Sequence, residues 1–203
     1  MIKKMVLGNM QVNCYIIYND KKHCVIVDPG AQGKKIYKYV VENELVVDGI
    51  ILTHGHFDHI GAVDYLYEKL QCPIYTHQET LELLNDPNLN LSCFDSPFTI
   101  NSPITIPDIK FQIGEFSFVW FLLEGHCQGS SMIYYPDEDI IFSGDVLFKG
   151  SIGRFDFPTS SHFATKQTLE IIKSFDFNAK ILPGHGDETT LEREKKDNPY
   201  LKS

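Results

Sequence analysis

Runs of β-branched and aromatic residues alternate along the chain with stretches of helical periodicity. Segments 12–18 and 23–28 predict two strands joined as a hairpin through Asn19-Asp20. Apolar residues at 36, 37, 40 and 41 predict a helix over 34–44. Further strands are predicted at 48–52, 73–75, 110–113, 115–122, 131–135, 140–142 and 180–182, and further helices at 61–70, 160–175 and 188–196. Residues 85–108, with four of the ten prolines, are predicted to be irregular. This alternation predicts an α/β protein, and the length of 203 residues favours one domain over 1–203.

Composition narrows the classes of function. The chain is 43% apolar and 22% charged, which is ordinary for a globular protein. Its formal charge of −9 disfavours nucleic acid and anionic membranes as partners. No stretch resembles a signal peptide or approaches the ~20 apolar residues of a membrane span. Five cysteines without a CxxC pair suggest neither a disulfide framework nor a thiolate zinc site, so we expect a cytoplasmic protein.

The densest group of metal-binding residues directly follows the predicted strand 48–52, in the segment THGHFDH (53–59). Imidazole and carboxylate suit zinc, iron and manganese. His54 and His56 would point to the same side of an extended segment, and Gly55 would allow a tight turn between them. Asp58 and His59 follow where the chain turns toward the next helix. Four donors would crowd one ion, so the segment predicts a pair of ions.

Three more candidate ligands follow other predicted strands. They are His126, Asp145 and His185, and each comes directly after a glycine. Loops at strand ends gather function in α/β folds, so we expect these side chains to meet the first four. The other three histidines sit in contexts that predict turn, surface or helix-start positions without a metal. They are His23, His77 and His162.

Four segments resemble the metallo-β-lactamase superfamily: THGHFDH (53–59), EGHCQGS (124–130), FSGDVLF (142–148) and LPGHG (182–186). The resemblance covers nearly the whole chain and implies a four-layer αββα sandwich with the metals at one edge of its two sheets. It also implies the ligand sets. One ion would take His54, His56 and His126, the other Asp58, His59 and His185, and Asp145 would bridge them.

Within the superfamily the segment GSIGRFD (150–156) is similar to the glyoxalase II group, the hydroxyacylglutathione hydrolases. In that group a basic residue at the position of Arg154 helps to hold a glutathione carboxylate. The sequence departs from the group at Asp156 and at Gly186-Asp187, where tyrosines are usual. Cys127 stands where threonine is usual, and we interpret it as a packing residue.

The resemblance implies a metal-dependent hydrolase, most simply with two zinc ions, that cleaves a small-molecule thioester or ester. Hydroxide generated between the ions would attack the carbonyl, and Asp58 would accept a proton. One alternative is a persulfide dioxygenase with one iron on the His54 pair, His126 and Asp145. A lactonase or lactamase, a nuclease and a non-catalytic metal-binding relative are further alternatives. The acyl group, the thiol, the metal and the oligomeric state stay open.

Overall fold

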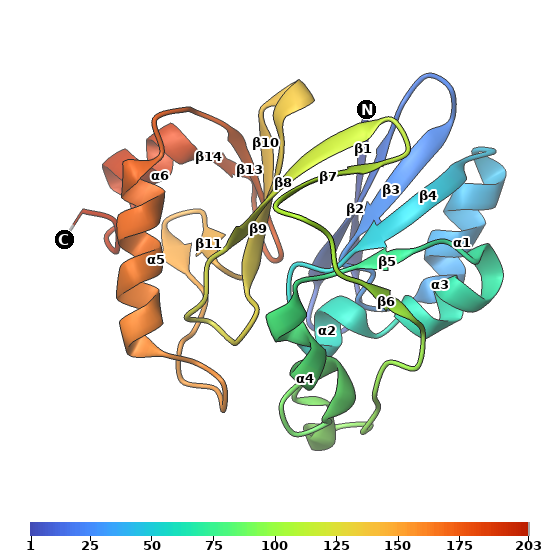
Figure 1. The fold of residues 1–203 in the computed structure, drawn as a ribbon, viewed down its shortest axis with the longest axis horizontal. Coiled ribbons are helices and arrows are strands. Elements are labelled where there is room, and N and C mark those ends of the chain that lie inside the picture. Colours follow the sequence, from blue (N-terminus) through green and yellow to red (C-terminus); the bar gives the residue numbers. More distant parts are fainter. Residues whose placement is uncertain (203) are drawn as a thin grey trace.

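The computed structural model describes residues 1–202, and Ser203, the last residue of the predicted domain, lies outside the described part. Two six-stranded sheets face each other, with helices on both outer sides (Figure 1). The first sheet has the order β1-β2-β3-β4-β5-β6. Its strands are β1 Ile2–Leu7, β2 Val12–Tyr18, β3 His23–Val27, β4 Val46–Ile51, β5 Ile74–Tyr75 and β6 Ile104–Thr105. Strands β1 to β3 pair antiparallel, and β3 to β6 pair parallel.

The second sheet has the order β14-β13-β10-β9-β8-β7. Its strands are β7 Lys110–Ile113, β8 Phe116–Leu122, β9 Ser131–Tyr135, β10 Ile140–Gly144, β13 Lys180–Pro183 and β14 Thr189–Thr190. Strands β10 and β13 pair parallel, whereas the other neighbours pair antiparallel. A separate hairpin joins β11 Leu147–Phe148 to β12 Ser151–Ile152.

Helices cover the outer face of each sheet (Figure 1). The α-helices are α1 Gly33–Glu42, α2 Phe57–Ile60, α3 Val63–Leu70, α4 Leu81–Asn85, α5 His162–Ser174 and α6 Leu191–Asp197. The short 3-10 helices are η1 Gln78–Thr80, η2 Ser92–Phe94 and η3 Pro136–Glu138. Helices α1 and α3 lie against the first sheet, and α5 and α6 against the second. The fold is therefore the predicted αββα arrangement.

Alternation along the strands explains the layers. On β2, Cys14 and Ile16 pack toward α1 and α3, whereas Tyr15 and Ile17 pack between the sheets. Successive side chains of a strand point to opposite faces, so a strand that is apolar throughout serves two cores at once. The middle core joins Phe118 of β8 to the first sheet, and the third core lies between the second sheet and its helices. Burial on both faces holds the sheets in a fixed relation.

Most predicted elements are confirmed, but two helices differ in extent. The predicted helix 61–70 begins later, as α3 at Val63, and the unpredicted helix α2 precedes it. The two are separated where Ala62 N–H donates to the Pro29 carbonyl and a Cβ at Gly61 would lie 2.4 Å from the Gly30 oxygen. The predicted helix 188–196 starts later. Thr189 and Thr190 pair with β13 as a strand, and the Thr190 side chain then caps α6 by accepting from Arg193 N–H.

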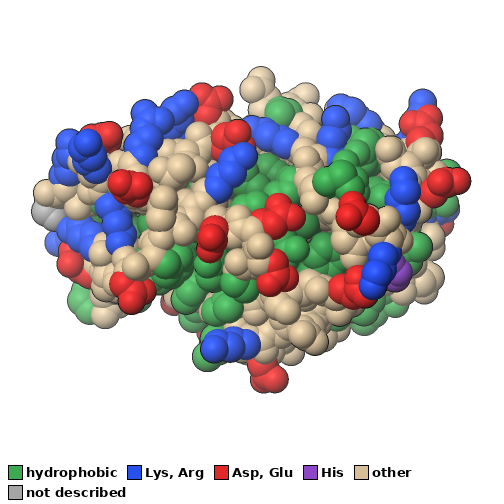
Figure 2. Space-filling model, turned by 90° about the horizontal axis from the view of Figure 1, so that it is seen from above, with side chains coloured by type: hydrophobic (Ala, Val, Ile, Leu, Met, Phe, Trp, Pro, Cys, Tyr) green, Lys and Arg blue, Asp and Glu red, His purple; other side chains and the backbone are tan. Residues whose placement is uncertain are grey.

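Short or mixed-pattern strands were not predicted. They are β1, β6 and the β11–β12 hairpin. Among residues 1–202 no helix has the length and apolar character needed to cross a membrane. On the face seen in Figure 2, acidic and basic side chains are interspersed around apolar groups without a broad basic surface.

Candidate metal centre

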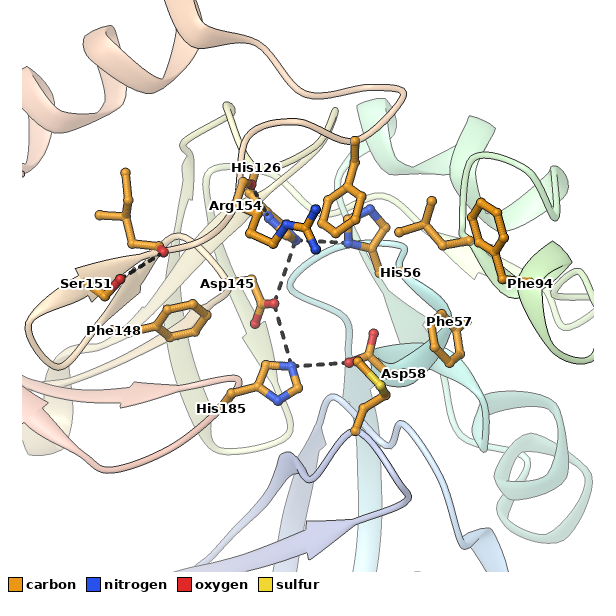
Figure 3. Close-up of a pocket in the computed structure, with 14 residues that line it drawn as sticks. His56, Phe57, Asp58, Phe94, His126, Asp145, Phe148, Ser151, Arg154 and His185 are labelled. Carbon is orange, nitrogen blue, oxygen red and sulfur yellow. Dashed lines mark hydrogen bonds and ion pairs between the residues drawn. The ribbon is translucent and has the colours of Figure 1, made fainter.

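The predicted ligands come together beyond the ends of strands of both sheets, and five of them are labelled in Figure 3. The segment after β4 carries His54 and His56, and α2 adds Asp58 and His59. The second sheet supplies the others after β8, β10 and β13, as His126, Asp145 and His185. The structure brings these seven side chains together, although they come from distant segments of the chain.

One group of donors is His54, His56 and His126, and the ligand atoms of these histidines and of Cys127 all lie within 4.8 Å of one another. His126 Nε2 is 2.9 Å from His56 Nδ1. His54 Nδ1 is 3.1 Å from the Thr53 hydroxyl, which leaves Nε2 facing the group. The first two histidines therefore do point to one side, as expected of an extended segment.

The second group is Asp58, His59 and His185, within the same limit of 4.8 Å. His185 Nε2 is 3.2 Å from Asp58 Oδ2 and 3.3 Å from His59 Nε2. Asp58 and His59 lie in the first turn of α2, where Asp58 faces His185 and the His59 ring has its centroid 4.1 Å from that of His54. One segment thus serves two positions, as the crowding of its donors predicted.

Asp145 lies between the two groups. Its Oδ1 is 3.3 Å from His59 Nε2, whereas its Oδ2 is 3.7 Å from His126 Nε2 and 3.6 Å from His185 Nε2. The carboxylate therefore reaches nitrogens of both groups. A side chain with two oxygens in this place is suited to touch two cations.

The surroundings of the first three histidines lower their pKa values, which favours the form that binds a cation. Burial, with the neighbouring imidazoles, holds the pKa of His54 well below its usual range and lowers the pKa of His56 to about 3. Burial also lowers the pKa of His126, although Asp145 opposes it. Neutral imidazole is the form that binds metal.

The carboxylates are held as anions. Burial would raise the pKa of Asp145, but His59, His126 and His185 outweigh it and keep that pKa well below its usual range. The pKa of Asp58 is likewise lowered by His59 and His185 against burial. In return the carboxylates raise the pKa of His59 and of His185 despite the burial of both rings. The pocket therefore favours positive charge among these atoms, and divalent cations would supply it.

Buried polar atoms without a hydrogen-bond partner also indicate a metal centre. Among the described residues, His54 Nε2, His56 Nε2 and Asp145 Oδ1 are buried without a hydrogen-bond partner. Such atoms are costly unless something binds them. A Cβ at Gly184 would lie 2.3 Å from Asp145 Oδ1 and 2.5 Å from His59 Cε1. Glycine at 184 therefore keeps the space between the ligands open, and the residues present fit a metal centre.

The expected role of Gly55 was wrong. Its backbone is not in the left-handed region, and a Cβ there would lie 2.6 Å from Leu83 Cβ. The glycine is needed because α4 packs directly against the ligand segment, not because the chain turns sharply between the histidines.

Sequence reasoning missed Asp28, which orients a ligand from behind. Asp28 is 2% exposed and follows β3 with a φ of 50°. Its Oδ2 is 2.9 Å from His59 Nδ1 and accepts from the Thr53 hydroxyl at 2.6 Å, while its Oδ1 accepts from Thr53 N–H. A carboxylate on the far nitrogen of a ligating histidine fixes its tautomer and its orientation. The available signal was that Asp28 ends a predicted strand, as the ligands do.

A clamp from the first sheet fixes the loop of His185. Asn13 Nδ2 donates to the Pro183 and Gly186 carbonyls at 2.9 Å and 3.0 Å. The Tyr15 hydroxyl donates to the same Pro183 carbonyl at 2.8 Å. Residues on either side of His185 are therefore held by β2, so the ligand position depends on the contact between the sheets.

Arg154 lies at the edge of the cluster, but both of its polar groups are engaged. Its carbonyl oxygen is 2.7 Å from His126 Nδ1 and so orients that ring. Its guanidinium donates twice to Asp156, with both distances 2.9 Å, and lies 4.6 Å from the centre of the Phe157 ring. The Arg154 side chain is 68% exposed, so this ion pair is weak.

Cys127 lies beside the first group of donors, and the three remaining histidines have other contacts. Cys127 is buried against the Ser130 hydroxyl, near the first three histidines, and burial raises its pKa to about 12. His23 pairs with Asp48 through Nδ1 at 2.8 Å. His77 accepts from Glu79 N–H, and His162 begins α5. These three histidines are absent from the groups of candidate ligands in residues 1–202.

A cavity of about 510 Å³ opens beside the cluster. Five of the candidate ligands line it, namely His56, Asp58, His126, Asp145 and His185, and Phe57, Phe94 and Phe148 flank them (Figure 3). A pocket with polar groups at its floor and apolar walls is the usual form of a small-molecule site.

Comparison with known proteins identifies the family. The profile described as metallo-beta-lactamase superfamily matches residues 7–185, so the chain belongs to this superfamily. The chain is 36% identical over 204 residues to the probable metallo-hydrolase YqgX of Bacillus subtilis (strain 168), covering 98% of this chain and 96% of that protein. It is 30% identical over 205 residues to the hydroxyacylglutathione hydrolase GloC of Haemophilus influenzae, covering 95% and 94%.

Solved structures agree. The BLEG-1 B3 metallo-beta-lactamase superposes with a TM-score of 0.94 at 37% identity, covering the whole of both chains. TTHA1623 in a di-iron-bound form superposes with a TM-score of 0.87 at 32% identity, covering 98% of this chain and 100% of that one. The chain is thus a metal-dependent hydrolase of the metallo-beta-lactamase superfamily.

Proposed function

We propose that this hydrolase holds two divalent ions and cleaves a small-molecule thioester. One ion would be held by His54, His56 and His126, the other by Asp58, His59 and His185, with Asp145 between them. The observation that carries this proposal is the position of Asp145, whose two oxygens lie within 3.7 Å of nitrogens of both groups. All seven donors are imidazole or carboxylate, which suits zinc first and iron or manganese next.

Two divalent ions, when bound here, would acidify water to near neutral pH and polarise a carbonyl oxygen. Side chains and backbone groups of the protein would accept the proton and hold the histidines in position. Asp58 lines the cavity with its Oδ2 at 3.2 Å from His185 Nε2, and as an anion it can accept a proton from the attacking water. Asp28 and the Arg154 carbonyl keep His59 and His126 from rotating. A thiolate leaves readily, so no protein acid is required for the thioester to break.

An S-acylglutathione is the thioester that the resemblance to glyoxalase II favours. Similarity to the hydroxyacylglutathione hydrolase of Haemophilus influenzae supports it. Arg154 is positioned at the pocket edge, and because its pair with Asp156 is exposed, a substrate carboxylate can compete for the guanidinium at small cost. We therefore propose Arg154 as a substrate-binding residue.

Metal content and turnover test the proposal. Protein purified without chelator should carry about two equivalents of zinc, iron or manganese, and should hydrolyse a thioester faster than the same protein stripped by a chelator. The identity of the metal in the preparation decides between zinc and the iron seen in the related di-iron structure. A content at or below one equivalent that added metal does not raise would contradict the dinuclear centre. Oxygen uptake with a persulfide would then indicate the mononuclear dioxygenase.

A further inference from the structure

The walls of the cavity are apolar beyond the candidate ligands. Five of its fourteen lining residues belong to the His/Asp cluster, which leaves nine, and seven of these nine are apolar. The other two are Ser151 and Arg154. A small polar acyl group would leave most of this wall exposed to water. The apolar wall therefore bears on which acyl group the site binds.

One wall is formed by Phe57 of α2 with the loop that follows α4 (Figure 3). Phe57 N–H donates to the Asn90 carbonyl at 2.8 Å, and the buried Asn90 side chain donates to the Phe98 carbonyl and accepts from Ser92 N–H. The loop is therefore fixed to the helix that carries two candidate ligands. Its shape presents apolar side chains beside those ligands.

Two residues of that loop, Leu91 and Phe94, have energetically unfavourable positions. Leu91 has a φ of 68°, in the left-handed region that residues other than glycine uncommonly adopt. Phe94 is 84% exposed, which is unusual for phenylalanine. Both line the cavity. A ring that is exposed in the protein alone and lies at the mouth of a pocket gains stability when an apolar ligand covers it.

The facing wall is the β11–β12 hairpin, which contributes Phe148 and Ile152. Helix α6 holds this hairpin in place. The carboxylate of Glu194 accepts from Gly150 N–H at 2.7 Å, and Asn198 Nδ2 donates to the Ser151 carbonyl at 3.0 Å. The hairpin is thus a supported wall, so a group between Phe148 and Phe94 would be enclosed by fixed apolar surfaces.

The two polar side chains of the wall have other partners than a hydroxylated acyl chain. The Ser151 hydroxyl donates to the Ile152 carbonyl at 3.3 Å, and the Arg154 guanidinium, which is proposed above to bind a carboxylate of the thiol, donates to Asp156. We propose that this site selects thioesters with an uncharged, apolar acyl chain of several carbons, and that Phe94 is a specificity-determining residue that packs on that chain. This inference rests on the proposed thioester hydrolysis, but the binding of the acyl chain can be measured without turnover.

The test uses thioesters of N-acetylcysteamine, a neutral thiol, with acetyl, butanoyl and hexanoyl chains, and the corresponding amides, which resist hydrolysis. Each buried methylene should raise kcat/KM by about two- to fourfold, since the pocket is partly open. Hexanoyl should therefore exceed acetyl by at least about tenfold in kcat/KM, and the hexanoyl amide should bind the metal-loaded protein at least about tenfold more tightly than the acetyl amide by calorimetry.

Phe94→Ala should reduce the hexanoyl-to-acetyl ratio at least about fivefold in both measurements. Phe163→Ala is the matched control, because Phe163 is also a strongly exposed phenylalanine, at 72%, and does not line the cavity. It should leave the ratio unchanged.

The outcomes separate the two proposals. If no thioester is hydrolysed but the hexanoyl amide binds more tightly, the thioester reaction is wrong and the apolar acyl site stands. If all chains are hydrolysed and bound alike, or if Phe94→Ala and Phe163→Ala behave alike, the apolar acyl site is overturned while the hydrolase stands.

Discussion

Asp28→Asn is the sharpest test of how the centre is held. The substitution keeps the size of the side chain and removes its charge. In the protein, one Asp28 oxygen faces both the Thr53 hydroxyl and His59 Nδ1, and the other accepts from Thr53 N–H. An amide that keeps its oxygen on Thr53 N–H must turn its NH₂ group toward His59. The ring would then carry its proton on Nε2, the nitrogen that faces Asp145 and His185.

The magnitude follows from that exchange of partners. A buried hydrogen bond to a charged group contributes about 1.5–3 kcal/mol, and each 1.4 kcal/mol is tenfold in affinity. We therefore expect Asp28→Asn to weaken metal binding by about ten- to a hundredfold, in the range known for partners of ligating histidines. The loss should fall on the ion bound by His59, so one of two equivalents should weaken more than the other.

Zinc affinity would be measured by competition with a chelator of known strength, after circular dichroism shows that each variant is folded. Asp48→Asn is the matched control, because Asp48 makes the same kind of contact, at 2.8 and 2.9 Å from His23 Nδ1, outside the cluster. It should leave zinc affinity within about twofold. Affinity of folded Asp28→Asn within about twofold of the parent, or an equal loss in the control, would refute the reasoning.

Three further predictions concern activity and stability. Asp145→Ala should lower kcat/KM for a thioester by at least about a hundredfold, because its two oxygens lie within 3.7 Å of nitrogens of both groups, whereas His77→Ala should change it little; equal losses would show that the ligand assignment is wrong. Arg154→Ala should raise KM for a glutathione thioester about three- to tenfold with little change in kcat, and leave the same acyl group on a neutral thiol unaffected; equal effects on both substrates would make the side chain structural. Burial raises the pKa of Cys24 to about 12 and of Cys72 to about 11, so both thiols stay protonated in the folded chain where unfolded thiols ionise. The stability present below about pH 8.5 should then fall by about 1.4 kcal/mol per pH unit for each thiol as the pH rises toward 11, and urea unfolding with a constant free energy up to pH 10.5 would contradict this.

The order of strands and helices could be predicted because burial on both faces leaves a strong local pattern. β2 is apolar at nearly every position, and the alternation of such runs with helical stripes indicates the class of fold directly. β1 escaped prediction because Lys3 and Lys4 interrupt its apolar positions, and its place in the sheet comes from pairing with β2. The break between α2 and α3 is also set from outside the segment, by the contact of Gly61 with the chain at Gly30. Such contacts between distant segments do not alter the spacing of apolar residues, so they cannot be predicted from that spacing.

The candidate ligands stand out in the sequence for a different reason. Metal binding demands particular donor atoms, and four of the seven lie in one short segment, so their identities stand out without any knowledge of the fold. The residues that support them do not stand out. Asp28 is one of 27 acidic residues, and only the packing of β3 beside β4 brings it to the back of His59. The apolar wall at Leu91 and Phe94 comes from the segment predicted to be irregular, where apolar residues follow neither the helical nor the strand spacing.

Arg154 shows why the supporting residues resist prediction from motifs. Its carbonyl oxygen orients His126, and any residue at position 154 with the same backbone would do so. Its guanidinium pairs with Asp156, the residue at which the sequence departs from the glyoxalase II group. A motif records only that an arginine stands there and cannot separate the two roles. Arg154→Ala removes the side chain and keeps the carbonyl, so a metal affinity that is unchanged together with a raised KM for the glutathione thioester would assign the backbone to the metal centre and the side chain to the substrate. A loss of metal affinity in that variant would instead mean that the ion pair with Asp156 shapes the loop, and the substrate role of Arg154 would then lose its support.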